Sequence, residues 1–195
     1  MQLKKVQKYI LKKLRDELPG NLTYHNAGHT VDVLNAAESI AIAENVAQYE
    51  KKLLLTAALF HDSGFLKGRD EHEQQSCNIA RKYLPGYNYS TDEIELICGI
   101  IMATRIPQSP KTQLAEILCD ADLDYLGRDD FFELSAKLFT ELHSEGLIGD
   151  ENAWNLEQER FMANHSYYTQ TSGKIRQGKK EEYINLVKSK ILHGS

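Results

Sequence analysis

The stretch LLLTAALFHDSG, residues 53–64, decides the fold. Its first eight residues are almost continuously apolar, which predicts a helix that is buried on most of its sides. His61 follows Leu54 by seven residues and Ala57 by four, so it continues the buried stripe of that helix. An imidazole that points into a core must be hydrogen-bonded or bound to a metal ion. The stretch therefore predicts a helical protein with a polar site at the end of a central helix.

Helical spacing continues on both sides of this stretch, and the alternation typical of strands is nearly absent. Ser90 and Glu93 form a capping box that starts one of the helices. Residues 171–180 are the most polar segment and are expected to form a mobile loop. The pattern predicts an all-α, bundle-like single domain over residues 1–195. Besides the central helix, the expected helices cover residues 3–14, about 29–40, 71–84, 90–104, 111–127, 129–143, 154–161 and 184–191.

Composition excludes several classes of protein. The 195 residues include 28 acidic and 23 basic ones, for a net charge of −5, which disfavours stable binding of nucleic acid. No apolar run approaches the roughly 20 residues that span a bilayer, and the first residues do not resemble a signal peptide. Cys77, Cys98 and Cys119 form no CxxC pair and are expected to be small buried side chains in a reducing compartment. We therefore expect a cytoplasmic protein without a membrane partner.

Imidazole and carboxylate side chains gather in four short segments, residues 24–29, 61–62, 72–73 and 120–124. His29 precedes Val33 by four residues and so lies on the apolar side of its helix. Counting 100° per residue from Leu114, Asp122 lies at about 80°, at the edge of the apolar stripe, and Asp120 at about 240°. Asp122 is thus the first choice for an inward-facing aspartate and Asp120 the second. The remaining acids of this segment, Asp124 and Asp129, are expected to be solvated.

Two histidines and two aspartates that converge on one point suit a divalent metal ion. Imidazole favours zinc, iron or manganese, and carboxylate favours manganese or magnesium, so the metal remains open among Mn, Fe, Zn, Ni, Co and Mg. A bound ion lowers the pKa of a water ligand and stabilises the charge that develops on a phosphoryl oxygen. The pattern predicts hydrolysis that depends on one or two metal ions per chain. The four candidate ligands are His29, His61, Asp62 and Asp122.

The order of a first His, a His-Asp pair on a buried helix and a late Asp resembles the HD-domain superfamily of metal-dependent phosphohydrolases. The match covers residues 24–127, which would form the motif core, with helices over 129–193 packed on it. YHNAGHTVDV is similar to the first motif of cyclic-nucleotide phosphodiesterases, and CDADLDYLG to the last motif of small bacterial HD phosphohydrolases. The resemblance implies the same four ligands, places Glu73 and Ser76 near the metal waters, and makes His25 a proton donor.

The function expected from this resemblance is hydrolysis of a phosphomonoester or phosphodiester, with a nucleotide as the substrate class. His25 and Asp62 would be catalytic, although His25 could instead cap the following helix. Lys67 and Arg69, in the loop after the His-Asp pair, and Arg105 are candidate cations for the phosphate. The weaker candidates kept for binding the substrate are Lys67, Arg105 and Glu73, and Lys174 and Arg176 could close over it.

Two alternatives remain open, an HD-fold di-iron oxygenase and a non-catalytic metal-binding or ligand-sensing domain. The chain is shorter than the phosphodiesterase domains and lacks an alignable base-clamping glutamine, so a cyclic nucleotide is only one candidate substrate. Trp154 could stack on a base, but it is assigned to the core, where aromatic residues of helices usually lie. A homodimer is left open.

Overall fold

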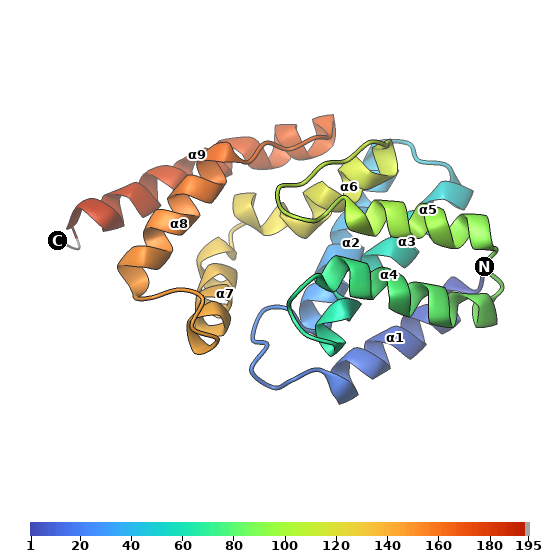
Figure 1. The fold of residues 1–195 in the computed structure, drawn as a ribbon. Coiled ribbons are helices and arrows are strands. Elements are labelled where there is room, and N and C mark those ends of the chain that lie inside the picture. The colour runs from blue at the N-terminus through green and yellow to red at the C-terminus, as the bar shows by residue number, and fades with distance from the viewer. Residues whose placement is uncertain (194–195) are drawn as a thin grey trace.

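The structure, a computed structural model, describes residues 1–193, and within this range it contains helices and no strand (Figure 1). The predicted all-α class is confirmed. Among these residues, no helix combines the length and the apolar character that crossing a membrane would require. The α-helices are α1 Leu3–Glu17, α2 Ala27–Ala43, α3 Gln48–Phe60, α4 His72–Tyr83, α5 Thr91–Met102, α6 Gln113–Asp122, α7 Phe131–Ser144, α8 Glu151–Asn164 and α9 Gln170–His193, and the 3-10 helices are η1 Ser63–Leu66, η2 Leu84–Tyr87 and η3 Asp124–Gly127.

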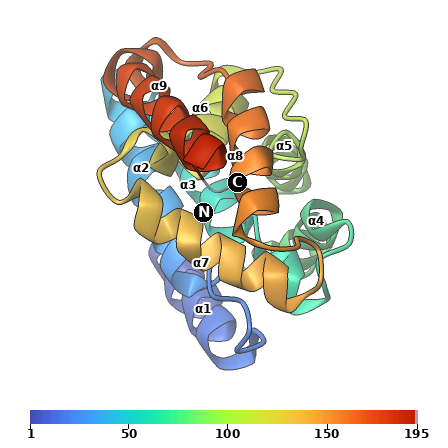
Figure 2. The ribbon, with the colours of Figure 1, turned by 90° about the vertical axis from the view of Figure 1, so that its left-hand side faces the viewer.

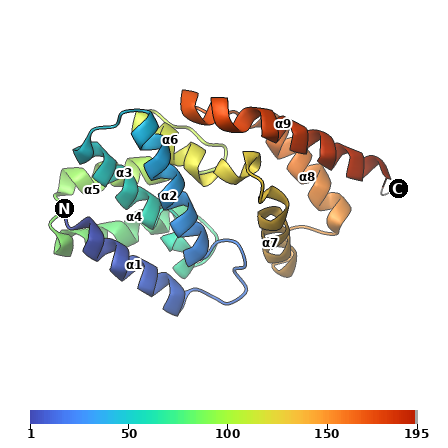
Figure 3. The same ribbon diagram turned by 180° about the vertical axis from the view of Figure 1, so that it is seen from behind.

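Helix α3 lies at the centre of the larger part of the molecule, which comprises α1 to α6 and is called the N-terminal bundle below. Every residue from Leu53 to Phe60 is buried, as the unbroken apolar run predicts. Helices α1, α2, α4, α5 and α6 all pack against α3, and Figure 3 shows them gathered on one side of the molecule. The capping box of Ser90 and Glu93 starts α5, as predicted. The bundle thus has one continuous apolar core.

Helices α7, α8 and α9 form a second part, called the C-terminal arm, which lies beside the bundle (Figures 1 and 2). Its apolar core is smaller and includes Phe131, Met162, Tyr183 and Val187. The rings of Phe131 and Tyr183 stack with their centroids 4.8 Å apart. Helix α9 runs along α8 and also packs on the η3 turn. The arm is therefore joined to the bundle through η3 and the start of α9.

The segment 171–180, expected as a mobile loop, is helical and forms the first part of α9, so that prediction is wrong. The Thr169 hydroxyl accepts a hydrogen bond from the Ser172 amide at 3.1 Å and so satisfies a free donor of the first turn. Thr169 is itself held by Asp120, whose carboxylate accepts from the Thr169 amide at 2.8 Å. The carboxylate of Asp120 therefore positions the residue that caps this helix. The polar composition of residues 171–180 predicts a loop because it does not reveal this contact with a distant part of the chain.

Asp124 was expected to be solvated, but it is buried in η3 and pairs with Arg176 of α9. Nε and Nη2 of Arg176 lie 2.6 and 2.9 Å from the two carboxylate oxygens. Gly127 allows this approach, since a Cβ there would lie 2.4 Å from the backbone oxygen of Arg176. Arg176 is thus engaged in joining α9 to η3. The predicted helix over 111–127 ends at Asp122, because the chain turns into η3 at this contact.

Candidate metal centre

His29 enters the site from the first turn of α2. The side chain of Asn26 caps this helix and accepts from the amides of Gly28 at 2.8 Å and His29 at 3.4 Å. The cap fixes the direction in which the helix starts, and with it the position of His29 in the first turn. Asn26 also takes the capping role that was the alternative interpretation of His25.

His61 and Asp62 follow the last residue of α3, where α4 holds the backbone in place. The Ser76 hydroxyl donates to the His61 carbonyl at 2.6 Å and accepts from the Gly64 amide at 2.8 Å. A Cβ on Gly64 would lie only 1.8 Å from the carbonyl oxygen of His72, so α4 can approach η1 this closely only over a glycine. The His-Asp pair is therefore held by two elements packed against each other.

The structure brings all four predicted ligands together. Nε2 of His29 lies 3.4 Å from Nε2 of His61 and 3.2 Å from Oδ1 of Asp122. Nε2 of His61 lies 3.4 Å from the same Asp122 oxygen. Oδ2 of Asp62 lies 3.4 Å from His29 Nε2 and 3.3 Å from His61 Nε2. The atoms of His29, His61 and Asp122 form a group within 4.8 Å of one another that could hold a metal ion.

Asp120, the second choice, lies outside this group. Its carboxylate accepts hydrogen bonds from the amides of Tyr168 and Thr169, both at 2.8 Å. Helical phase thus separates the two aspartates as expected. The face that Asp120 occupies is nevertheless fully buried, because the start of α9 covers it.

The chemistry of the cluster suits a divalent cation. Nδ1 of His61 contacts the Ala58 carbonyl at 2.8 Å and must donate there, which leaves Nε2 of the neutral ring with a lone pair directed at the cluster. Asp62 Oδ2 is buried and lacks a hydrogen-bond partner among residues 1–193. Atoms bound about 2.1 Å from one ion lie about 3.0–3.4 Å apart when adjacent, in agreement with these distances.

The electrostatics of the cluster also call for positive charge. Burial disfavours a charged imidazole, yet Asp62 and Asp122 beside it hold the pKa of His61 well above its usual value. Burial likewise disfavours the Asp62 carboxylate, but His61 lowers its pKa. Hydrogen bonding to His29 lowers the pKa of Asp122 against the same cost of burial. Buried acids of this kind require a compensating cation or proton.

His72 and Glu73 lie on the other side of Asp62. Nε2 of His72 is 3.6 Å from Asp62 Oδ1 and 3.5 Å from Glu73 Oε1, and its Nδ1 contacts the Arg69 carbonyl at 3.1 Å. The sequence singles out this His-Glu pair, although it ranks only Glu73 as a candidate. The two oxygens of Asp62 therefore face two different groups of possible ligands.

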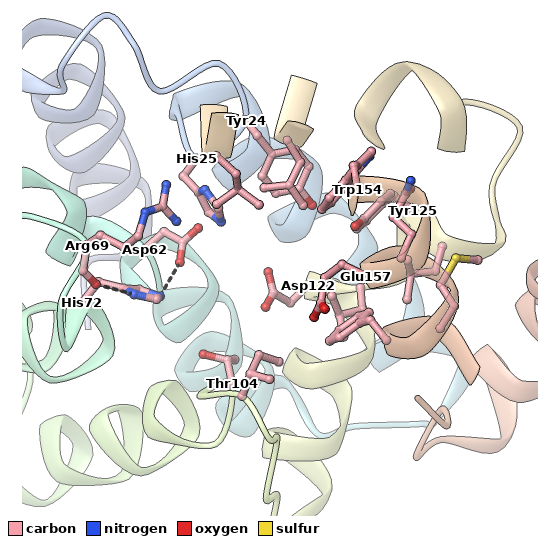
Figure 4. A pocket seen from close by; sticks show the side chains of 18 of the residues that line it. Tyr24, His25, Asp62, Arg69, His72, Thr104, Asp122, Tyr125, Trp154 and Glu157 are labelled. Carbon is pink, nitrogen blue, oxygen red and sulfur yellow. Dashed lines mark hydrogen bonds and ion pairs between the residues drawn. The ribbon is translucent and has the colours of Figure 1, made fainter. Parts of the chain in front are cut away.

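The cluster opens into a cavity of about 320 Å³, between the bundle and the arm (Figure 4). This volume is at the lower end of the roughly 300–1,000 Å³ typical of sites for small molecules. One end of the cavity is polar and the other is largely apolar. The polar end is lined by His25, Asp62, Arg69, His72, Glu73 and Asp122, and the apolar end includes Leu138, Leu142, Trp154, Phe161 and Met162.

Glu141 of α7 is a buried residue of this site that sequence reasoning missed. Its carboxylate accepts from the amides of Tyr24 at 2.8 Å and His25 at 2.9 Å, and it lies 2.5 Å from Nδ1 of His25. Arg69 donates to it at 2.6 Å. Burial disfavours its charge, but these bonds, chiefly that from His25, lower the pKa of Glu141 to about 2. Glu141 thus fixes the ring of His25 at the polar end.

Two of the weaker candidates lie away from the cavity. Lys67 is exposed and is absent from the lining. Arg105 is also exposed, and its guanidinium lies 3.9 Å from Glu71. Arg69, two residues beyond Lys67, lines the cavity instead. Of the two cations that the sequence offers in this loop, Lys67 and Arg69, the structure thus places Arg69 at the cavity.

A helical bundle that gathers a His, a His-Asp pair and a late Asp at the end of its central helix defines a class of metal-binding α-helical proteins. The family model described as HD domain matches residues 26–124, half of the chain. The chain therefore belongs to the HD-domain family. An uncharacterized protein of Clostridium beijerinckii is 28% identical over 117 residues, which are 58% of this chain and 73% of that one.

Solved structures share the fold at low identity. A crystal structure from Lactobacillus plantarum has a TM-score of 0.67 at 18% identity and covers 97% of this chain and 96% of its own. A predicted HD superfamily hydrolase from an uncultured Thermotogales bacterium has a TM-score of 0.61 at 19% identity, covering 96% and 92%. Bacillus subtilis YpgQ in complex with ADP has a TM-score of 0.65 at 18% identity, covering 97% and 98%.

Proposed function

We propose that the protein is a metal-dependent phosphohydrolase that cleaves a phosphomonoester or phosphodiester of a small molecule, with nucleotides as the substrate class. The observation that carries this proposal is the cluster of His29, His61, Asp62 and Asp122 at the polar end of the cavity. A protein of the same fold is described as a hydrolase, and another was crystallised with ADP. Both descriptions support the proposal.

A divalent ion bound by these four residues would supply a water of lowered pKa and a positive charge for a phosphoryl oxygen. Arg69 lines the same end; its Nε and Nη2 donate to Glu145 and Glu141, and Nη1 makes no hydrogen bond within the described residues. That nitrogen can donate to the phosphate. His25, held at Nδ1 by Glu141, keeps Nε2 for donating a proton to the leaving oxygen. These roles remain proposals.

The ligand set favours a transition metal, because two imidazoles suit Mn, Fe, Zn, Ni or Co better than Mg. One ion follows from the main cluster. Asp62 Oδ1, His72 and Glu73 are the groups that would hold a second. We therefore propose one or two ions per chain.

Elemental analysis of the protein purified without chelator tests the proposal. The wild type is expected to hold one or two transition-metal ions per chain, and Asp62→Ala to lose them. Release of phosphate or nitrophenol from p-nitrophenyl phosphate, its bis-ester and a nucleotide panel should follow the metal. Asp129→Ala is the matched control, because Asp129 is exposed and lies away from the cavity.

The other outcomes separate the rival functions. If the wild type holds no metal and binds none on reconstitution, the proposed enzyme is wrong. Metal without turnover of any phosphoester would favour a metal-stabilised sensing domain. Oxygen consumption with an iron-specific optical spectrum would favour a di-iron oxygenase.

A further inference from the structure

Helix α8 turns one face toward the cavity. Trp154, Gln158 and Phe161 follow one another at spacings of four and three residues, which places them on the same side of the helix, and all three line the cavity. Figure 4 shows Trp154 across the cavity from the polar end. The buried amide of Gln158 lies between the two aromatic residues in sequence. The amide of Gln158 and the carboxylate of Glu157, which also lines the cavity (Figure 4), thus interrupt the apolar wall.

A chain of hydrogen bonds fixes the orientation of that amide. The indole Nε1 of Trp154 can only donate, and it donates to the Ser135 hydroxyl at 3.2 Å. The Ser135 hydroxyl has one hydrogen of its own, which it donates to Oε1 of Gln158. The carbonyl side of the amide is therefore used within the protein. Its NH2 group meets no acceptor among the described residues and is left for a ligand.

The two ends of the cavity call for two different parts of one molecule. The cluster of His29, His61, Asp62 and Asp122, called the metal-type cluster below, suits a phosphoryl group together with Arg69. The aromatic residues of α8 suit a flat ring. A ring that rests on this wall meets the NH2 group of Gln158. A ring oxygen there would accept a hydrogen bond, whereas a ring amino group would place two donors opposite each other and leave both unsatisfied.

We propose that Gln158 reads the base of a nucleotide and selects bases with an oxo group, such as hypoxanthine, guanine or uracil, over those with an amino group at the same edge. This inference rests on the proposed function and names the substrate class of the same site. Trp154 and Ser135 act through Gln158 by holding its amide in one orientation.

The test uses Trp154, the only tryptophan of the chain, as a fluorescent reporter of binding. The metal-loaded protein is mixed in a stopped-flow instrument with inosine or adenosine 5′-monophosphate, whose bases differ at the edge in question. Quenching in the first milliseconds, before turnover, gives the affinity. We expect the inosine nucleotide to bind about tenfold or more tightly, which is the effect of leaving a buried polar group unpaired.

Three variants test whether the preference depends on the orientation of the Gln158 amide. Gln158→Glu replaces the free donor by an acceptor when ionised, so at pH 8 the preference should reverse toward the adenosine nucleotide. Ser135→Ala frees the amide to turn, so the two affinities should come within about threefold of each other. Gln170→Glu, a matched change at an exposed residue of α9, should keep the wild-type preference.

Equal affinities of the wild type for the two nucleotides, or no quenching by either, would overturn the inference without need of any variant. So would an unchanged preference in a folded, metal-loaded Gln158→Glu protein. A protein that discriminates the two nucleotides but hydrolyses no phosphoester contradicts only the proposed function. A protein that hydrolyses p-nitrophenyl phosphate but shows no discrimination contradicts only the inference.

Discussion

The N-terminal bundle and the C-terminal arm are held in place by different forces. The bundle surrounds α3 with apolar side chains from five other helices, and all four residues of the metal-type cluster come from it. The arm has a smaller apolar core, which Tyr24 of the bundle and Leu123 also join, and it meets the bundle through several buried polar contacts as well. These contacts are Asp120 with Thr169, Asp124 with Arg176, and Glu141 with His25 and Arg69.

The difference separates two tasks. The bundle fixes the groups proposed to bind a metal through apolar packing around α3, and hydrogen bonds of Ser76 and Asn26 position the His-Asp pair and His29 within it. The arm supplies the wall against which a substrate would rest, and directional hydrogen bonds set the position of that wall. Such contacts locate the arm accurately, but each one leaves a buried group unpaired if its partner is lost. Changes in the bundle should therefore remove metal, and changes in the arm should alter what binds.

The largest effect is expected from Gly64→Ala in the bundle. The new Cβ would lie 1.8 Å from the His72 carbonyl oxygen, so α4 must move away from η1 and the His-Asp pair. We expect a loss of about 3 kcal/mol or more in the free energy of unfolding, together with loss of bound metal. Denaturant unfolding and elemental analysis measure both. Gly99→Ala in α5 is the control, where a Cβ meets nothing and should stabilise by up to about 1 kcal/mol.

Gly127→Ala makes the corresponding change at the joint with the arm. Its Cβ would lie 2.4 Å from the Arg176 carbonyl oxygen, so α9 must shift relative to η3. We expect a loss of about 2 kcal/mol, with metal retained and Trp154 fluorescence altered. Loss of metal equal to that of Gly64→Ala would show that the two regions do not act separately.

Glu141→Gln tests the polar attachment through pH. Since the pKa of Glu141 is lowered from its ordinary 4.5 to about 2, the stability that its charge provides is complete above 4.5 and disappears as the pH falls toward 2. The variant lacks this contribution, so the wild type should be more stable by about 2–3 kcal/mol at pH 6 and by little near pH 2. Denaturant unfolding across this range measures the gap. A gap that stays constant with pH would contradict the assignment.

The smallest effect is expected from Arg105→Ala, because this exposed side chain makes only a 3.9 Å surface contact with Glu71. Stability should change by less than about 0.5 kcal/mol and kcat/KM by less than about twofold. Arg69→Ala, which removes a cation from the cavity lining, should lower kcat/KM by about tenfold or more. If the two variants lowered kcat/KM equally, Arg105 would again be a candidate for binding the substrate.

The sequence predicts what depends on local spacing. The helical class, the buried central helix and the convergence of His29, His61, Asp62 and Asp122 all follow from which residues lie on the same side of a helix. The family is confirmed, while the roles of the four ligands stay predictions. The order of the four candidate ligands along the chain was sufficient for the family, and all four lie within the matched residues 26–124.

What the sequence did not predict depends on contacts between distant segments. Glu141 meets Tyr24 and His25 across a separation of more than a hundred residues, and no local pattern marks such an acid as buried. The polar start of α9 is helical because Asp120 holds its cap. Gln158 acquires its orientation only through Ser135 of a different helix. These residues belong to the arm or to its joints, where tertiary contacts override local composition.

The contacts that join the arm to the bundle can form only late in the synthesis of the chain. Asp120 and Asp124 leave the ribosome beside Asp122, the last residue of the metal-type cluster, but their partners Thr169 and Arg176 follow only some 50 residues later. At roughly 5–20 residues per second, the nascent bundle spends several seconds without Thr169 and Arg176, the partners that cover these two carboxylates in the finished fold. In that interval the metal-type cluster is complete, while the cavity still lacks the wall that α8 supplies.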